Sequence, residues 1–301
     1  LSSADNANLA PLYLYPTEAK QDLFEDGGHW SAGVDGRVPN LDAGFVEALA
    51  AQVQMTFVSE GKGNLGQKVK GKGQQDTFGP EDVLAWIYGV FHSPSYRSRY
   101  AAFLKIDFPR VPLPTDGGEF ARICEIGHAL MALHLMESPI LDEADRQPRF
   151  PVAGDNVVEA GYPKYEITRQ KAKGKGQKDG SGCAAENNTP SPRCAGYSPL
   201  AGGESNKASG AGTGPCQGER LAGRVYINAA QYFEPVRADV WGFMIGGYQV
   251  CDKWLKDRKG RKLTYDDLAH YQQIVSALAE TIRLMQDIDA AITASGGWPI
   301  K

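Results

Sequence analysis

A short stretch near the C-terminus concentrates positive charge. Between Asp252 and Lys262 the sequence carries six basic and two acidic side chains, although the formal net charge of the chain is −4. Lysine and arginine grouped in this way can neutralise phosphates, and each neutralised phosphate adds a salt-dependent increment to affinity. The alternative is an ordinary solvated turn. The basic residues of this stretch are Lys253, Lys256, Arg258, Lys259, Arg261 and Lys262. The preceding pair, Gly246 and Gly247, can let the backbone turn tightly or approach another surface closely.

A second group of basic and aromatic residues recurs at helical spacing in HSPSYRSRYAAFLK, residues 92–105. Such side chains supply phosphate contacts that position a protein on a duplex, and arginine can also read guanine. The alternative here is a solvated helix face. The candidate contacts of this group are Tyr96, Arg97, Arg99, Tyr100, Lys105 and Arg110. We expect Arg97, Arg99 and Arg110 to be the ones that could also discriminate between bases.

Catalytic motifs are missing from the sequence. It has no GxxxxGK[ST], no GxGxxG after a strand, no HExxH and no GxSxG. His128 and His134 lie six positions apart on one expected helix and so on different faces, which argues against a joint metal site. The cysteines have no CxxC spacing, and we expect unpaired thiols, with a metal or disulfide clasp at Cys183, Cys194 and Cys216 as the alternative. The GDN at 154–156 is typical of a turn.

The hydrophobic pattern predicts a helix-rich α+β fold with short mixed strands and a long C-terminal helix. Helices are expected at 40–53, from Pro80, from Ser93-Pro94 and at 119–137, and strands at PLYLYP, QMTFVSE and RVYINAAQYF. The last helix opens at Thr264, with Asp267 placed as the far half of a capping box. Its apolar residues alternate three and four apart, a spacing that favours packing against another helix. That helix could belong to the same chain or to a separate protein.

We treat residues 1–301 as one domain. Between residues 169 and 220 the composition changes to Lys, Gly, Ser, Asn and Pro, which predicts a mobile insertion. No apolar run is long enough to span a membrane. The first residue is not Met, so the sequence is expected to be part of a longer polypeptide. We also expect that polypeptide to be cytoplasmic and monomeric.

Several long blocks together resemble the C-terminal specificity region of type ISP restriction–modification enzymes. They are FGPEDVLAWIYGVFHSPSYRSRYAAFLKIDFPRVPLP, RFPVAGDNVVE, GRVYINAAQYFEPV and IGGYQVCDKWLKDRKGRKLTYDDLAHYQQIV, with PLYLYP and RVPNLDAGFVEAL at the opening. The resemblance covers about 11–60, 77–167 and 222–298. The family passes quickly from a GDNVVE-like to a RVYIN-like segment, whereas here the 169–220 insertion intervenes.

The resemblance implies a target-recognition domain that binds double-stranded DNA and presents one adenine to an N6-methyltransferase domain elsewhere in the same parent chain. It also implies that this fragment is no enzyme and holds no cofactor. S-adenosylmethionine, ATP and Mg²⁺ would then serve the methyltransferase, translocase and nuclease parts of the parent. One alternative is a protein-interaction module that docks through the C-terminal heptad helix. A second is a free-standing enzyme, which the missing motifs disfavour.

Overall fold

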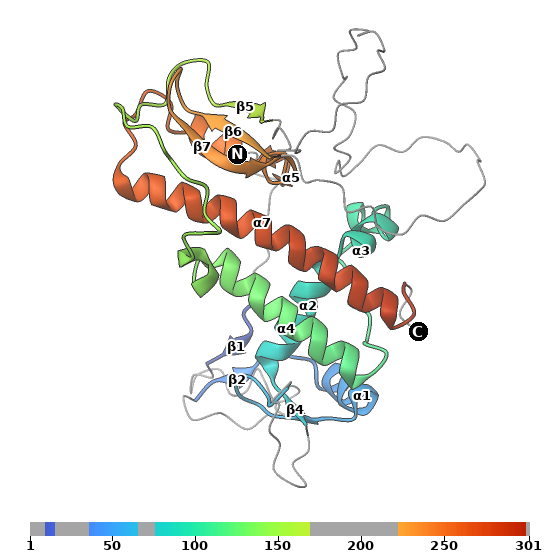
Figure 1. Cartoon of the computed structure of the whole chain (residues 1–301). Helices are drawn as coiled ribbons and strands as arrows, with labels where there is room; N and C mark the ends of the chain where they lie inside the picture. Colours follow the sequence, from blue (N-terminus) through green and yellow to red (C-terminus); the bar gives the residue numbers. More distant parts are fainter. Residues whose placement is uncertain (1–9, 16–35, 66–75, 169–221, 299–301) are drawn as a thin grey trace, which may run out of the picture. The chain divides into compact units, whose positions relative to one another are not determined.

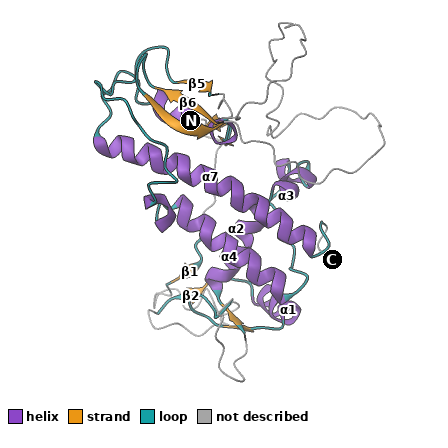
Figure 2. Cartoon of the chain, viewed as in Figure 1, coloured by secondary structure: helices purple, strands orange, loops and turns teal. Residues whose placement is uncertain are grey.

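The computed structural model describes residues 10–15, 36–65, 76–168 and 222–298, and it divides into two compact units. Unit 1 comprises residues 1–138 and 283–301, and unit 2 comprises residues 139–282. The course of the chain is drawn in Figure 1, and Figure 2 distinguishes helices from strands. The expected insertion at 169–220 and its three cysteines lie outside the described residues.

Unit 1 is mostly helical. Its helices are α1 (Ala43–Val53), α2 (Pro80–His92), α3 (Pro94–Arg99), α4 (Gly117–His134) and the C-terminal part of α7 (Tyr265–Ala294), with a 3₁₀ turn, η2 (Phe103–Lys105). Its strands are short: β1 (Tyr13–Leu14) pairs antiparallel with β2 (Val38–Pro39), and β3 (Thr56–Phe57) pairs parallel with β4 (Thr77–Phe78).

Helices α2 and α4 approach each other closely through small residues. A Cβ atom added at Gly127 would lie 2.0 Å from the carbonyl oxygen of Ala85, and one at Gly89 would lie 2.8 Å from the side chain of Ile123. These glycines therefore let the two backbones meet. Around the contact, Trp86 and Phe120 are fully buried.

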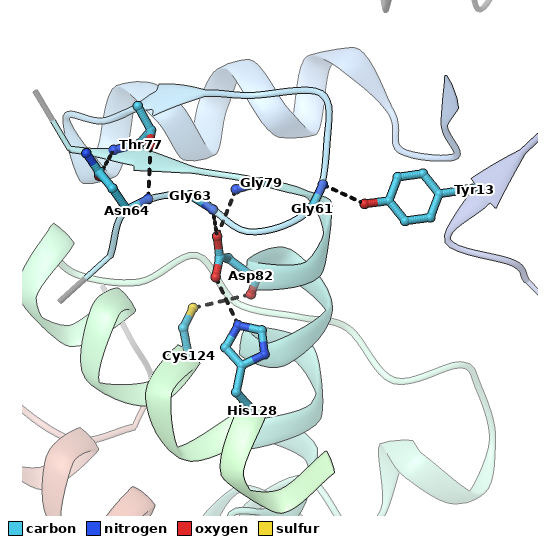
Figure 3. Close-up of polar contacts among 9 residues, drawn as sticks. All are labelled: Tyr13, Gly61, Gly63, Asn64, Thr77, Gly79, Asp82, Cys124 and His128. Atoms are coloured by element: carbon cyan, nitrogen blue, oxygen red, sulfur yellow. Dashed lines mark hydrogen bonds and ion pairs between the residues drawn. The ribbon is translucent and has the colours of Figure 1, made fainter. Parts of the chain in front are cut away.

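The Asp82 carboxylate ties the start of α2 to the preceding loops and to α4 (Figure 3). Its Oδ2 accepts hydrogen bonds from the backbone N–H of Gly63 at 2.6 Å and of Gly79 at 2.9 Å, and its Oδ1 lies 2.9 Å from His128 Nε2. Burial acts to raise the pKa of Asp82, but the hydrogen bonds from His128, Gly63 and Gly79 outweigh it and the pKa is lowered. Asn64 and Thr77 exchange hydrogen bonds nearby, at 2.7 and 3.1 Å.

Unit 2 is built around a three-stranded antiparallel sheet. The strands are β5 (Lys164–Ile167), β6 (Ala222–Tyr226) and β7 (Tyr232–Arg237), in the order β5-β6-β7. A 3₁₀ turn, η3 (Pro139–Asp142), opens the unit, and the chain continues from the sheet through α5 (Ala238–Trp241), β8 (Met244–Ile245), β9 (Tyr248–Gln249) and α6 (Val250–Lys256) into α7. The core includes Val225, Phe233, Cys251, Leu255 and Tyr271.

The segment RVYINAAQYF was predicted to be strand-like, and the structure divides it between the end of β6 and the start of β7, with a turn between them. The cause is Asn228, whose Oδ1 accepts hydrogen bonds from the backbone N–H of Ala230 at 3.0 Å and of Gln231 at 2.7 Å. A side-chain bond of this kind offers the backbone a turn in place of a continuing strand.

The C-terminal helix α7 begins as predicted. Thr264 and Asp267 form the capping box, with Asp267 N donating to Thr264 Oγ1 at 3.1 Å and Thr264 N donating to Asp267 Oδ2 at 3.0 Å. The thirty residues of the helix correspond to about 45 Å of rod. Heptad residues along its length are buried within this chain: Tyr271, Val275, Leu278, Met285 and Ile292. The seam is therefore covered by the chain itself, which removes the basis for docking a separate protein through it.

The α+β prediction, with its long C-terminal helix, is confirmed. Among the described residues, no helix is long and apolar enough to cross a membrane.

Candidate nucleic-acid interface

Two basic surfaces result from the fold, one in each unit. We call Arg97, Arg99, Lys105 and Arg110 of unit 1 the arginine surface. We call Lys253, Lys256, Arg258, Lys259, Arg261 and Lys262 of unit 2 the basic turn.

Helix α3 positions the first two arginines, and its start is fixed by hydrogen bonds to α7. Ser93 is the N-cap, and its Oγ accepts from the backbone N–H of Tyr96 at 3.0 Å. The same hydroxyl donates to Asp289 Oδ1 at 2.5 Å, and Ser95 Oγ donates to that oxygen at 2.7 Å. In the sequence Asp289 stands out only as a polar interruption of the heptad pattern, but in the structure it anchors α3.

The two tyrosines of this group support the surface from below. Tyr96 is buried, and its hydroxyl donates to the backbone oxygen of Arg110 at 2.7 Å. Tyr100 is half-buried, and its ring lies 4.9 Å from that of Tyr96 and 6.2 Å from that of Trp298. The structure therefore places Tyr96 in the core, where it holds the backbone of Arg110, and does not present it to solvent as a DNA contact would require.

The four basic side chains of the arginine surface are exposed. Arg97 is partly committed, because its Nε donates to the backbone oxygen of Phe91 at 2.6 Å. Arg110 lies 3.9 Å from Asp107, which is the only acidic residue between positions 83 and 115. Four cations and one carboxylate therefore lie along residues 97–110, although the net charge of the chain is negative.

Within the basic turn, three of the six cations already have carboxylate partners. Lys253 pairs with Asp257, and Lys256 pairs with Asp252 at 2.7 Å, both one helical turn apart on α6. Arg258 lies over the ring of Trp254, with its guanidinium carbon 3.5 Å from the ring centroid, and its Nε reaches Asp267 at 3.4 Å. Arg258 therefore links α6 to the first turn of α7.

The other three cations of the basic turn, Lys259, Arg261 and Lys262, differ from these in their surroundings. All three are exposed, and within the described ranges no carboxylate pairs with them. Their backbone is nevertheless held firmly, because Gly260 N donates to Val158 O at 2.8 Å and Val158 N donates to Arg261 O at 3.2 Å. Unpaired cations on an ordered backbone are suited to binding phosphate oxygens, since little order must be imposed on binding.

The GDN segment forms the support of the basic turn. It is a turn, as predicted: Gly154 lies at a bend, and Asn156 has a positive φ of 57°. Leu263 N donates to Asn156 O at 2.8 Å, which continues the contact between residues 156–158 and 260–263. Residues far apart in the sequence are therefore joined at this point.

Two buried amides that sequence reasoning missed hold this support. Gln231 exchanges hydrogen bonds with Asn156, donating from Nε2 to Oδ1 at 2.7 Å and accepting at Oε1 from the backbone N–H at 2.9 Å. Asn228 Nδ2 donates to Gln231 Oε1 at 2.9 Å and to the backbone oxygen of Val157 at 3.2 Å. The sequence does contain a sign of this role, namely two amide residues inside a strand-like segment. Amides that become buried need hydrogen-bond partners.

The glycine pair near α6 makes the tip of a hairpin. Gly246 and Gly247 have φ values of 55° and 87° and connect β8 to β9, which explains why glycine is needed at both positions. The hairpin presents Ile245 and Tyr248 to solvent. The interpretation of the pair as a tight turn is therefore confirmed.

His128, His134 and the two described cysteines serve structure. His128 faces Asp82, and His134 Nδ1 lies 2.6 Å from the hydroxyl of Tyr88, so the two histidines point to different partners. Cys124 and Cys251 are buried free thiols, and desolvation raises the pKa of Cys251 to about 12, which makes a thiolate nucleophile unfavourable. The described part of the chain holds no cluster of His, Cys, Asp and Glu suited to a metal ion.

Comparison with solved structures finds distant similarity. A nuclease-deletion mutant of the Type ISP restriction-modification enzyme LlaGI, in complex with a DNA substrate mimic, is 16% identical with a TM-score of 0.38, covering 72% of this chain and 14% of that one. The DrdV–DNA complex is 18% identical with a TM-score of 0.37, covering 69% and 18%. The ATP-dependent Type ISP restriction-modification enzyme LlaBIII bound to DNA is 11% identical with a TM-score of 0.39, covering 92% and 14%.

The present chain thus spans less than a fifth of the length of those three proteins. The comparison with curated proteins finds no match. The family model of the type ISP C-terminal specificity domain, however, matches residues 1–287, nearly the whole chain. The chain therefore belongs to the type ISP C-terminal specificity domain family.

Proposed function

We propose that this chain recognises a target sequence in double-stranded DNA and holds the flanking duplex while a methyltransferase domain of the same parent polypeptide methylates one adenine at N6. The observation that carries the proposal is a set of three cations, Lys259, Arg261 and Lys262, that have no carboxylate partner among the described residues and lie on an ordered turn in a chain of the specificity-domain family. Phosphate contacts from such a turn fix the register of a protein on a duplex.

The division of labour follows from the chemistry. An adenine inside a duplex must leave the base stack before its amino group can react, so a domain that grips the neighbouring base pairs is needed. In this proposal the chain itself performs no catalysis. S-adenosylmethionine, ATP and Mg²⁺ act in other parts of the parent, which would be a cytoplasmic, monomeric restriction–modification enzyme.

The two basic surfaces have different roles in this proposal. The basic turn supplies grip that is independent of sequence. The arginine surface supplies contacts that can also distinguish bases, because a guanidinium can bond both acceptors on the major-groove edge of guanine. Residues 1–301 act as one recognition domain in this scheme, and the insertion expected at 169–220 remains a prediction.

The test uses a pool of duplexes randomised over about 20 base pairs, a window wide enough for a typical recognition site. The natural full-length polypeptide is incubated with the pool, and the bound duplexes are sequenced. We expect one short motif containing adenine to be enriched. With S-adenosylmethionine present, that adenine should become N6-methylated by the full-length polypeptide and stay unmodified with the 301-residue chain alone.

Two outcomes would contradict the proposal. If no motif is enriched by the full-length polypeptide, the chain is not a recognition domain. If the 301-residue chain methylates DNA by itself, the assignment of catalysis to the rest of the parent is wrong.

A further inference from the structure

The segment after α3 presents an unusual concentration of exposed apolar side chains. Phe103 is 71% exposed, Ile106 is 85% exposed and Phe108 is 75% exposed, all within six residues. A single exposed apolar residue needs no explanation, but a contiguous group of large ones marks a binding surface. We call Phe103, Ile106 and Phe108 the apolar tip.

The tip is an ordered projection with fixed ends. Ile106 N and Asp107 N both donate to the backbone oxygen of Phe103, at 3.0 and 3.1 Å, which closes a tight turn. In a 3₁₀ turn, side chains three positions apart lie on the same side, so Phe103 and Ile106 point together. At its base the Tyr96 hydroxyl holds Arg110 O at 2.7 Å.

The chain after the tip is also fastened. Trp86 Nε1 donates to the backbone oxygen of Pro112 at 3.2 Å, and the segment between is spaced by Pro109 and Pro112. Proline lowers the conformational entropy that a loop loses when it binds. The apolar side chains are therefore presented on a backbone that is held by hydrogen bonds on both sides of the tip.

The charge around the tip indicates its partner. Arg99, Lys105 and Arg110 surround the three apolar residues in the sequence, and all are exposed. The one acid nearby, Asp107, is engaged by Phe108 N at 2.8 Å and lies 3.9 Å from Arg110. Apolar side chains flanked in the sequence by cations match a partner with an apolar interior and a negatively charged outside. Double-stranded DNA is such a partner, because its stacked bases lie between two phosphate backbones.

We propose that the apolar tip inserts into the DNA duplex and unstacks one base step, while Arg99, Lys105 and Arg110 hold the DNA on either side of that step. Phenylalanine and isoleucine are among the residues that act as wedges between base steps, where they kink the duplex. The site is thus a wedge that deforms DNA, in addition to the contacts that grip it. This inference rests on the proposed function.

The wedge explains why apolar residues and cations share one short segment. Phosphate contacts alone would need no Phe or Ile at the surface. Unstacking a base step weakens the neighbouring duplex, which favours the extrusion of a nearby base that a methyltransferase requires. The energy needed depends on the step, so the tip also contributes preference at a position that no hydrogen bond reads.

The experiment compares F103A/I106A/F108A with the unaltered natural polypeptide. Each polypeptide is titrated with the duplex enriched from the randomised pool, in which 2-aminopurine replaces one purine at a time. The unaltered protein should raise the fluorescence at one step, because unstacking relieves quenching. The triple variant should lose this rise and bind the duplex at least tenfold more weakly. F103L/F108L should keep most of the fluorescence rise and most of the affinity.

The matched control is Leu135→Ser, which removes an apolar side chain that is 66% exposed in the same unit, outside the apolar tip. It should change neither fluorescence nor affinity. Because all three tip side chains are exposed, the triple variant should melt at the same temperature as the unaltered 301-residue chain.

Three outcomes would overturn the wedge. If the triple variant keeps the fluorescence rise and the affinity, the tip does not enter the stack, although motif enrichment would leave the proposed function standing. If the triple variant lowers the melting temperature of the full-length polypeptide without DNA, but not that of the 301-residue chain, the tip is a contact to the rest of the parent. If the unaltered polypeptide enriches no motif, both the proposed function and the wedge fail.

Discussion

Asp289 Oδ1 accepts a 2.5 Å hydrogen bond from Ser93 Oγ, 196 positions earlier in the chain. Ser93 is fully buried, so its hydroxyl depends on this partner and on the backbone N–H of Tyr96, which it caps. The bond connects the last turns of α7 to the start of the helix that carries Arg97 and Arg99. The helix that carries Arg97 and Arg99 is therefore anchored at its start by a residue near the end of α7.

Asp289→Ala should destabilise unit 1 by about 1–3 kcal/mol, because it leaves a buried hydroxyl without its acceptor. Urea unfolding followed by tryptophan fluorescence measures the loss. The control is Asp287→Ala, which breaks only an exposed pair with Arg283 on the same helix and should cost less than about 0.5 kcal/mol. Equal losses in the two variants would show that the bond to Ser93 is not what matters.

The basic turn offers a matched pair of double substitutions. K259A/K262A removes two lysines that pair with no carboxylate in the part of the chain that the structure describes, whereas K253A/K256A removes two lysines that are paired with Asp257 and Asp252. Both change the net charge equally. We expect K259A/K262A to weaken binding to cognate and scrambled duplexes alike and to reduce the slope of log affinity against log salt by about 2. K253A/K256A should change that slope less.

A salt titration of DNA binding by the full-length polypeptide measures both variants. An equal change of slope in the two variants would mean that the basic turn acts through its overall electrostatic potential and makes no direct contacts with phosphates. Arg258 is left out of this test because its stacking on Trp254 and its bond to Asp267 give it a structural role. Arg258→Ala would confuse lost stability with lost binding.

The arginine surface can be tested at constant charge. R99K/R110K keeps both positive charges but removes the planar fork that bonds guanine twice. Affinity for the cognate duplex should fall by about 1–3 kcal/mol per lost guanine contact, with a smaller change for scrambled DNA. Arg97→Lys is the comparison, since Arg97 Nε is already bonded to Phe91 O. A uniform loss on all duplexes would make these arginines positioning residues.

Gly154→Ala should disturb the support of the basic turn. A Cβ atom at this position would lie 2.6 Å from Gln231 Cδ, so the amide that holds Asn156 must move. We expect a loss of about 1–3 kcal/mol in unfolding free energy, because a buried amide loses its partners. Gly242→Ala is the control in the same unit, where the nearest atom is 3.3 Å away and φ is −78°. Similar losses would refute a role for Gln231.

His92 should make unit 1 sensitive to acid. Burial lowers its pKa from 6.5 to about 4, with Arg97 and His134 acting in the same direction against a bond to Tyr88 O. Between these two values the unfolded chain binds the proton and the folded chain does not, so stability falls as pH drops from 6.5 to 4, by at most about 3 kcal/mol. His134, whose pKa burial also lowers, adds in the same sense.

His92→Phe should flatten this dependence when unfolding free energy is measured at several pH values. The control is His270→Phe, which alters an exposed histidine of unit 2. An unchanged slope in His92→Phe would assign the acid sensitivity to other groups.

The helices were predictable because their signals are local. Pro80 at the first turn, Ser93 before Pro94 and the Thr264–Asp267 capping box each fix a boundary through neighbours within four positions. The same is true of the basic character of 252–262. What these signals could not give is the ion pair between Arg258 and Asp267, which lie nine positions apart and meet only in the fold.

The elements that were missed depend on contacts between distant residues. Asn228 and Gln231 looked like part of a strand, because their partners at 152–157 lie more than 70 positions away. Tyr96 looked like a surface aromatic because its neighbour Trp298 lies 202 positions later, where a ring 5.3 Å away helps to bury it. The β8–β9 hairpin had a local signal, two glycines between apolar residues, that predicts a turn but not the exposure of its strands.

Helix α7 contributes its last part to unit 1, whose other elements all precede residue 139. During synthesis the ribosome therefore releases α1 to α4 long before Leu284, Met285, Ile288 and Asp289 exist. The apolar core of unit 1 therefore stays incompletely covered until all of unit 2 has been synthesised. A chain truncated directly after unit 2 would leave unit 1 in that state permanently, so such a shortened protein should aggregate even though no residue of its first half is missing.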